Sequence, residues 1–157
     1  MNHHTTTRIP VNDDYAALVG KAVYVFAYYE WTIIWITEHL SAGFVQEYSR
    51  ESVMTSGRVK MKFEDAIQNL ESMPEGVTEE ELVECKELFS QLIDKRNALI
   101  HAHPCTDNDG SQILAYQTKI TKPIPDMKWP VSEVNSIISE FDSAGCIASG
   151  LLDRLRT

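Results

Sequence analysis

The sequence predicts an all-α protein folded as an antiparallel bundle of four to five helices, and three observations lead to this class. Apolar residues recur at three- and four-residue spacing over long stretches without proline, which is typical of amphipathic helices. Polar helix-starting residues precede these stretches, and Gly or Pro follows them. At 157 residues and 43% apolar content, the chain suits one domain with a proper core. We therefore expect a flexible tail at 1–11 and a single helical domain at 12–157.

The first predicted helix starts at Asn12, Asp13 and Asp14 and covers 15–40, where no proline occurs. Its middle, residues 22–36, is apolar nearly all the way round, so this helix should be buried on most sides. Its aromatic surface is large for one small domain, because it includes Tyr24, Tyr28, Trp31 and Trp35. A second copy of the chain packed on this helix would cover that surface, and so would other helices of the same chain.

Glu30 lies at the centre of this apolar run. The run is shorter than a membrane span requires and carries this charge, so we expect no contact with a membrane. A carboxylate in apolar surroundings must be paired or neutralised. We hypothesise that Glu30 meets Arg96, in the same subunit or across an interface, and orients it. The alternative is that Glu30 lies on the one solvent-exposed edge of the helix.

Further helices are expected on both sides of a short β segment. A short one covers 63–70, and a longer one begins with a capping box at Thr78 and Glu81 and ends near Ala102. The last begins at Ser132, which we expect to cap it, and its apolar spacing continues to Leu155. Turn-forming residues at 107–110 and looser alternation at 113–120 predict a short β-hairpin near 111–129.

The most distinctive chemistry lies at the end of the long 78–102 helix, where Arg96, Asn97 and His101 follow one another. The apolar stripe of this helix reaches Arg96, so a charge stands where the pattern asks for an apolar residue. Arginine binds phosphate through a bidentate fork, and histidine has the unperturbed pKa closest to neutral. These residue types favour phosphodiester chemistry, with Arg96, Asn97 and His101 as the candidate catalytic residues.

At these residues the chain resembles the HEPN superfamily (higher eukaryotes and prokaryotes nucleotide-binding domains). The hallmark of that family is Arg, four to six residues and then His, often with Asn directly after the Arg, at the end of a helix in an all-α bundle. The resemblance implies a homodimer whose two motifs line one cleft, built here from the first helix and the Arg96–His101 helix. It also implies a metal-independent endoribonuclease without cofactors, used as a toxin or in antiviral defence, with RNA as its substrate and an antitoxin as a regulatory partner.

One position departs from a branch of that family. Relatives paired with nucleotidyltransferase antitoxins often carry Tyr two residues after the motif His, where this chain has His103. Control by modification of that Tyr is therefore not expected here. His103 is instead a candidate for a second acid–base or phosphate-contacting group.

Other residues were considered as ligands for a metal or for RNA. The spacing His101-x-His103-x-Cys105 would gather three metal ligands only on a strand, and here it straddles a helix end, so no metal is expected. Two local groups of cations are candidates for RNA contacts, Arg58, Lys60 and Lys62 in the first and Lys119 and Lys122 in the second.

The whole-chain composition limits the function further. A net charge of −9 argues against a nonspecific binder of polyanions and weakens the case for an RNA enzyme unless its cleft is locally positive. Three cysteines without CxxC spacing, and a first segment without an apolar signal, favour a cytoplasmic location. Two readings stay open: an active ribonuclease, and a catalytically inactive HEPN-like module that binds a nucleotide, RNA or a protein partner.

Overall fold

The computed structural model describes residues 9–51, 54–121 and 124–157, and most of this part of the chain is helical, as predicted. The bundle is built from five helices in the described residues: α1 (Asp13–Leu40), α2 (Phe44–Arg50), α3 (Ser56–Gln68), α4 (Glu79–Ile100) and α5 (Val131–Leu155). None of them is long and apolar enough to cross a membrane.

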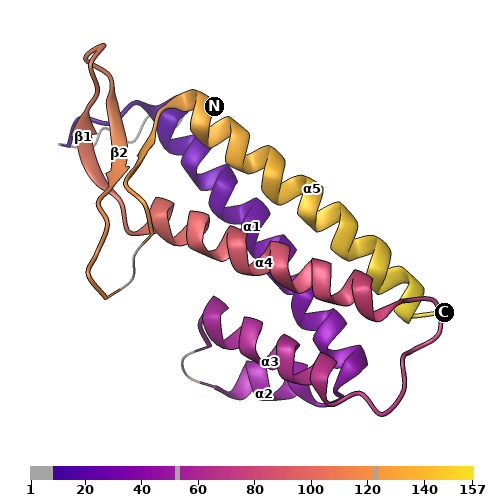
Figure 1. The fold of residues 1–157 in the computed structure, drawn as a ribbon. Helices are drawn as coiled ribbons and strands as arrows, with labels where there is room; N and C mark the ends of the chain where they lie inside the picture. The colour runs from indigo at the N-terminus through magenta and orange to yellow at the C-terminus, as the bar shows by residue number, and fades with distance from the viewer. Residues whose placement is uncertain (1–8, 52–53, 122–123) are drawn as a thin grey trace.

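Of the three long helices, α1 and α5 run in the same direction, and α4 crosses them in the opposite direction (Figure 1). α1 and α5 start at the same end, where the Tyr15 hydroxyl donates to the Trp129 carbonyl at 2.6 Å. α4 runs the opposite way, and its first turn meets the end of α5 through Arg154 and Glu81, 2.9 Å apart. The antiparallel arrangement expected from the sequence therefore holds for α4, whereas α1 and α5 are parallel.

The helix starts follow local signals where the sequence supplies them. The Asn12 side chain accepts a hydrogen bond from the Tyr15 backbone N–H, and Thr78 forms the predicted capping box with Glu81. α5 is different, because it begins at Val131 directly after Pro130, and no side chain caps it. The prediction that Ser132 caps this helix was therefore wrong.

A three-stranded antiparallel sheet lies at the end of the bundle where α1 and α5 begin and α4 ends (Figure 1). Its strands are β1 (His103–Thr106), β2 (Gln112–Tyr116) and β3 (Met127–Trp129), in the order β1-β2-β3. The hairpin predicted near 111–129 corresponds to the pairing of β2 with β3, in which Leu114 lies opposite Trp129. β1 was not predicted. Pro104 fits within it because β1 is an edge strand that pairs on one side only.

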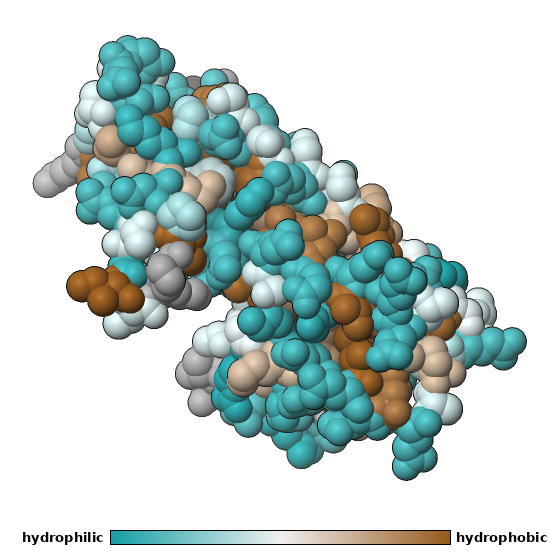
Figure 2. Space-filling view, in the orientation of Figure 1, coloured by the Kyte–Doolittle hydropathy of each residue, from teal (hydrophilic) through white to brown (hydrophobic). Residues whose placement is uncertain are grey.

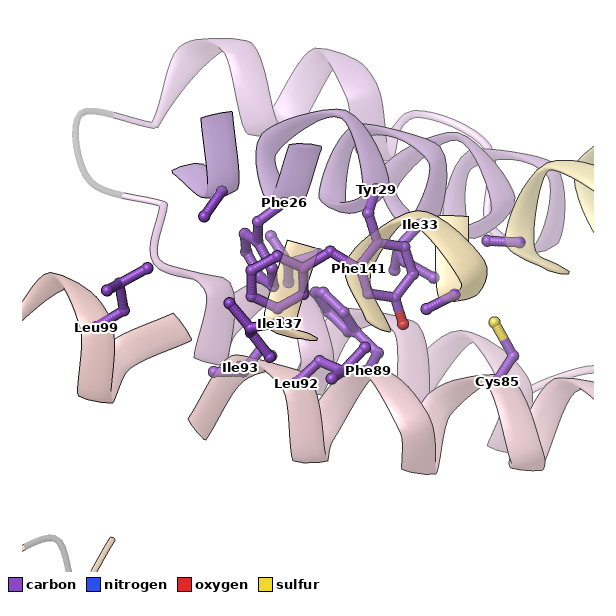
Figure 3. Packing of buried hydrophobic residues seen from close by; sticks show 14 of the residues in the cluster. Phe26, Tyr29, Ile33, Cys85, Phe89, Leu92, Ile93, Leu99, Ile137 and Phe141 are labelled. Atoms are coloured by element: carbon purple, nitrogen blue, oxygen red, sulfur yellow. The ribbon is translucent and has the colours of Figure 1, made fainter. Parts of the chain in front are cut away.

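The centre of the core is a group of four aromatic rings from all three long helices (Figure 3). The Phe26 ring of α1 lies 5.0 Å from Phe141 of α5 and 6.2 Å from Phe89 of α4, between centroids. Tyr29 meets Phe89 edge-on at 5.5 Å. These separations lie in the favourable range for aromatic pairs, so the rings hold α4 against the α1–α5 pair.

The end of α4 is capped by the sheet. The Trp129 indole N–H donates to the Ala98 carbonyl at 3.1 Å, and this contact is buried. In a continuing helix the backbone N–H of Ala102 would serve that carbonyl, but it bonds to Leu99 at 3.3 Å. Tyr15 completes the link, because its hydroxyl also accepts from the Leu114 backbone N–H at 3.0 Å.

The Trp129→Phe substitution tests this cap. Phenylalanine keeps most of the buried ring but removes the indole N–H, which leaves the buried Ala98 carbonyl without its donor. We expect a loss of about 1–3 kcal/mol in the free energy of unfolding, measured by urea denaturation. As a control, Trp31→Phe removes an indole from a partly exposed position and should change stability by less than about 0.5 kcal/mol. Equal losses for the two variants would show that the indole N–H of Trp129 adds nothing.

Candidate functional site

Arg96 is the centre of the candidate site, and its guanidinium points from α4 toward α1 and the start of α3. The guanidinium carbon lies 5.0 Å from the centroid of the Phe26 ring. One terminal nitrogen donates to the Asn97 side-chain oxygen at 2.9 Å, and the other donates to the Ser56 hydroxyl at 2.7 Å. The group is half-buried. A charge at an apolar position of the helix is thus accommodated by a ring beneath it and an oxygen on each side.

Ser56 is the site residue that the sequence did not indicate. It occupies the first position of α3, directly after the capping residue Thr55, and only 4% of its surface is exposed. One serine in a segment that reads as a loop gives no signal of this role, because the role depends on α3 packing against α4. Its hydroxyl accepts from Arg96 and keeps its own proton to donate.

Glu30 lies beside this pair rather than in solvent. Burial raises its pKa above the usual value, while a hydrogen bond from Ser56 and the charge of Arg96 act in the opposite direction. Among the described residues, Glu30 makes no ion pair with Arg96 within 4.0 Å, and its Oε2 atom is buried without a hydrogen-bond partner. Within one subunit, Glu30 and Arg96 are therefore linked through Ser56.

Tyr48 of α2 is the third residue near this carboxylate, after Ser56 and Arg96. Its pKa is raised by burial first and by the charge of Glu30 second, which places its hydroxyl within electrostatic reach of Glu30. The raised pKa of Glu30 means that it holds a proton at a higher pH than an ordinary glutamate does. A carboxyl with a raised pKa thus lies near the Arg96 guanidinium.

His101 and Asn97 differ in whether their side chains are already hydrogen-bonded. His101 caps α4, donates its backbone N–H to the Asn97 carbonyl at 3.0 Å, and leaves its imidazole exposed. The side-chain oxygen of Asn97 accepts a hydrogen bond from Arg96. The amide NH₂ of Asn97 remains as a donor on the His101 side of the helix, since residues four apart share a face.

His103, the candidate for a second acid–base group, is the first residue of β1. His103 is exposed, and its Nδ1 lies 3.1 Å from the Pro104 carbonyl. Cys105 follows two residues later on the same strand, whereas His101 belongs to the helix end. In the described part of the chain no group of three or more His, Cys, Asp or Glu is placed to hold a metal ion.

The predicted RNA-contacting cations are mostly engaged with acidic or polar neighbours. Arg58 and Lys62 of α3 pair with Glu51 at 3.5 Å and Glu47 at 2.8 Å. Lys60 donates to Ser90 of α4 at 3.5 Å. Lys119 is exposed between β2 and β3, and Lys122 lies outside the described residues. Arg58 and Lys62 thus already have acidic partners, whereas Arg96 contacts the neutral oxygens of Asn97 and Ser56.

The aromatic residues of α1 are partly uncovered. Tyr24 is 73% exposed and Tyr28 is 63% exposed, and Trp31 is also exposed, while Trp35 is half-buried. Trp31 contacts Trp35 and Tyr48, with ring centroids 6.1 and 6.0 Å apart. The other helices thus cover only part of the aromatic surface that the sequence singled out.

Comparison of the chain with known protein families, with curated proteins and with solved structures gave no significant match. The resemblance to HEPN proteins therefore rests on the motif and its position at a helix end.

The Glu30→Gln substitution tests the state of the buried carboxyl. The pKa of Glu30 is raised in the folded protein, so its stabilising contribution is fully present below the unfolded value of 4.5 and is lost as pH rises through the folded pKa. Glutamine does not titrate. We therefore expect the stability of the variant, relative to wild type, to increase from about pH 4 to about pH 7.5 in urea denaturation.

Glu71→Gln, at an exposed position, serves as the matched control and should show a constant difference from wild type over the same range. A loss of stability by Glu30→Gln relative to wild type as pH rises would mean that attraction to Arg96 outweighs burial.

Proposed function

We propose that this chain is a metal-independent endoribonuclease of the HEPN type that acts as a homodimer. One observation supports this function best: Arg96 is held in place by Phe26, Ser56 and Asn97, in the same motif that leaves the His101 imidazole exposed. A guanidinium has five N–H donors, and the two bonds to side chains leave three for a phosphate. A pre-oriented cation next to an exposed acid–base group is what phosphodiester cleavage requires.

In the proposed reaction, His101 takes the proton from a ribose 2′-hydroxyl as general base. The 2′-oxygen attacks the adjacent phosphorus, and the bond from phosphorus to the 5′-oxygen breaks. A second imidazole, His101 of the partner subunit or His103, gives a proton to the leaving 5′-oxygen. Arg96 stabilises the negative charge that develops on the phosphoryl oxygens. The products are a 2′,3′-cyclic phosphate and a free 5′-hydroxyl.

The proposed dimer brings a second copy of the motif to the site. Val23 of α1 and Ile100 at the end of α4 are exposed apolar residues on the helices that carry the site. Val23 and Glu30 are seven residues apart, so Val23 lies near the same side of α1 as Glu30. An isologous contact through this surface would place two His101 side chains near one cleft.

We also propose a biological role for this activity. A cytoplasmic toxin or antiviral effector that cleaves RNA and is restrained by an antitoxin fits the motif. Arg58, Lys60 and Lys62 on α3, with Lys119 in the β2–β3 segment, are proposed to guide the RNA strand. The role of Ser56 in this proposal is to hold Arg96.

A second candidate is an inactive HEPN-like module that binds a nucleotide, RNA or a protein. The observation in its favour is that the Arg96 contacts also serve a structural purpose, since they fix α4 to α1 and α3. The net charge of −9 favours it as well.

The decisive test compares wild type with Arg96→Ala and His101→Ala. We expect purified wild type to cleave total RNA in EDTA and to leave 2′,3′-cyclic phosphate ends, and each variant to lose at least about 100-fold in rate. In a bacterial host, wild type should arrest growth and both variants should not.

His39→Ala is the matched control, because His39 is an exposed residue in the last turn of α1 and should be dispensable. Mixing the two inactive variants tests the dimer, because only a mixed dimer brings an intact Arg96 from one subunit and an intact His101 from the other to the same cleft. Intact RNA with wild type at matched soluble levels, or equal yields of cyclic ends from His101→Ala, would favour the binding module.

A further inference from the structure

A groove of about 540 Å³ runs between α1 and α5, and its surface is largely apolar. Its α1 wall carries Tyr24 and Tyr28, the two most exposed tyrosines of that helix. Tyr24 and Tyr28 lie about 100° and about 140° around α1 from Val23, so they face away from the proposed dimer surface. Contiguous exposed apolar surface of this kind is typical of sites that bind a partner or a ligand.

The α5 wall of the groove is made of small residues. Gly145, Cys146, Ser149 and Gly150 line it, which lets another backbone come close. A Cβ on Gly145 would lie 3.8 Å from Tyr29, whereas a Cβ on Gly150 would meet nothing within 4 Å. Gly145 therefore serves the packing of α5 on α1, and Gly150 opens onto free space.

Charge marks both ends of the groove. Asp142 and Asp153 line it and are exposed, and neither takes part in an ion pair within the described part of the chain. They are eleven residues apart, which is about three helical turns or 16 Å. Together with Cys146 and Ser149 they follow the four-three-four spacing of one helix face.

The groove between α4 and α5 provides a contrast. Hydrophobic surface is visible there in the middle of Figure 2, but Lys95 and Glu140 form an ion pair across it at 2.7 Å. Its charges are therefore already paired within the chain. The carboxylates of the α1–α5 groove are not.

We propose that the α1–α5 groove binds an amphipathic helix of a partner protein, with two basic residues about eleven positions apart. The apolar face of that helix would pack between the tyrosines and the small residues of α5, in the manner of helix-in-groove recognition. Its two cations would meet Asp142 and Asp153. A second copy of the chain fits poorly, because two-fold pairing of α5 with itself brings carboxylates together, Asp142 to Asp153 or each to itself.

This binding does not depend on RNA cleavage, so its test uses a peptide. The probe is an 18-residue fluorescein-labelled helix with Leu at four-three-four spacing and Lys at two positions eleven apart. The comparison peptide has Glu at those two positions. We expect the full-length chain to bind the Lys peptide at least tenfold more tightly in fluorescence anisotropy, and the Lys peptide to slow alkylation of Cys146 but not of Cys105.

Two sets of variants make the result specific to the groove. Asp142→Lys with Asp153→Lys should reverse the preference between the peptides, while Asp65→Lys with Asp94→Lys, the same charge change at exposed sites elsewhere, should leave it unchanged. Gly150→Leu should fill the groove and abolish binding without lowering the thermal midpoint, since leucine suits a helix better than glycine.

Four outcomes would overturn the proposal. They are no binding of either peptide, equal affinity for both, a preference that survives reversal of Asp142 and Asp153, and undiminished binding by Gly150→Leu. Self-association of wild type that Gly150→Leu abolishes would assign the groove to a second copy instead. The proposed catalytic dimer, formed elsewhere on α1, should be unaffected by that substitution.

Discussion

The hydrogen bond from the Trp129 indole to the Ala98 carbonyl is the contact on which the candidate site depends. It ends α4 at a fixed place, because it satisfies a carbonyl that the helix itself no longer serves. Tyr15 fixes the same point from α1 by bonding to the Trp129 carbonyl. The small sheet therefore joins the ends of three helices, and the exposed His101 imidazole is positioned by residues far from it in the sequence.

With α4 fixed in this way, Arg96 is directed into the space between α1 and α3. A guanidinium there loses part of its hydration, and the Phe26 ring and two oxygen acceptors offset the loss. Glu30 experiences the opposite balance, since burial outweighs the help from Ser56 and Arg96 and raises its pKa. Arg96 thus has hydrogen-bond acceptors for both terminal nitrogens, whereas one oxygen of Glu30 has no donor. A substitution of Glu30 is therefore expected to cost less stability than one of Arg96.

The sequence predicted what local rules control. The caps at Asn12 and Thr78 and the three long helices follow from side-chain patterns within a few residues, and all were found. Ser56 and strand β1 were missed because each is defined by its partner, Arg96 in one case and β2 in the other. Within the chain, Ser56 stands between Glu30 and Arg96 for the same reason: the sequence shows that both charges need partners but not which atom lies between them.

The charge distribution decides how RNA could be held at the proposed site. Arg58 and Lys62 are already paired with acidic side chains, so a phosphate would have to compete with Glu51 and Glu47 for them. Arg96 is satisfied by neutral oxygens and needs to give up nothing to bind an anion. A chain with a net charge of −9 would therefore grip one or two phosphates at the motif rather than a long stretch of backbone. Selectivity for an RNA would then come from the shape of the cleft and its stacking surfaces more than from general attraction to the polyanion.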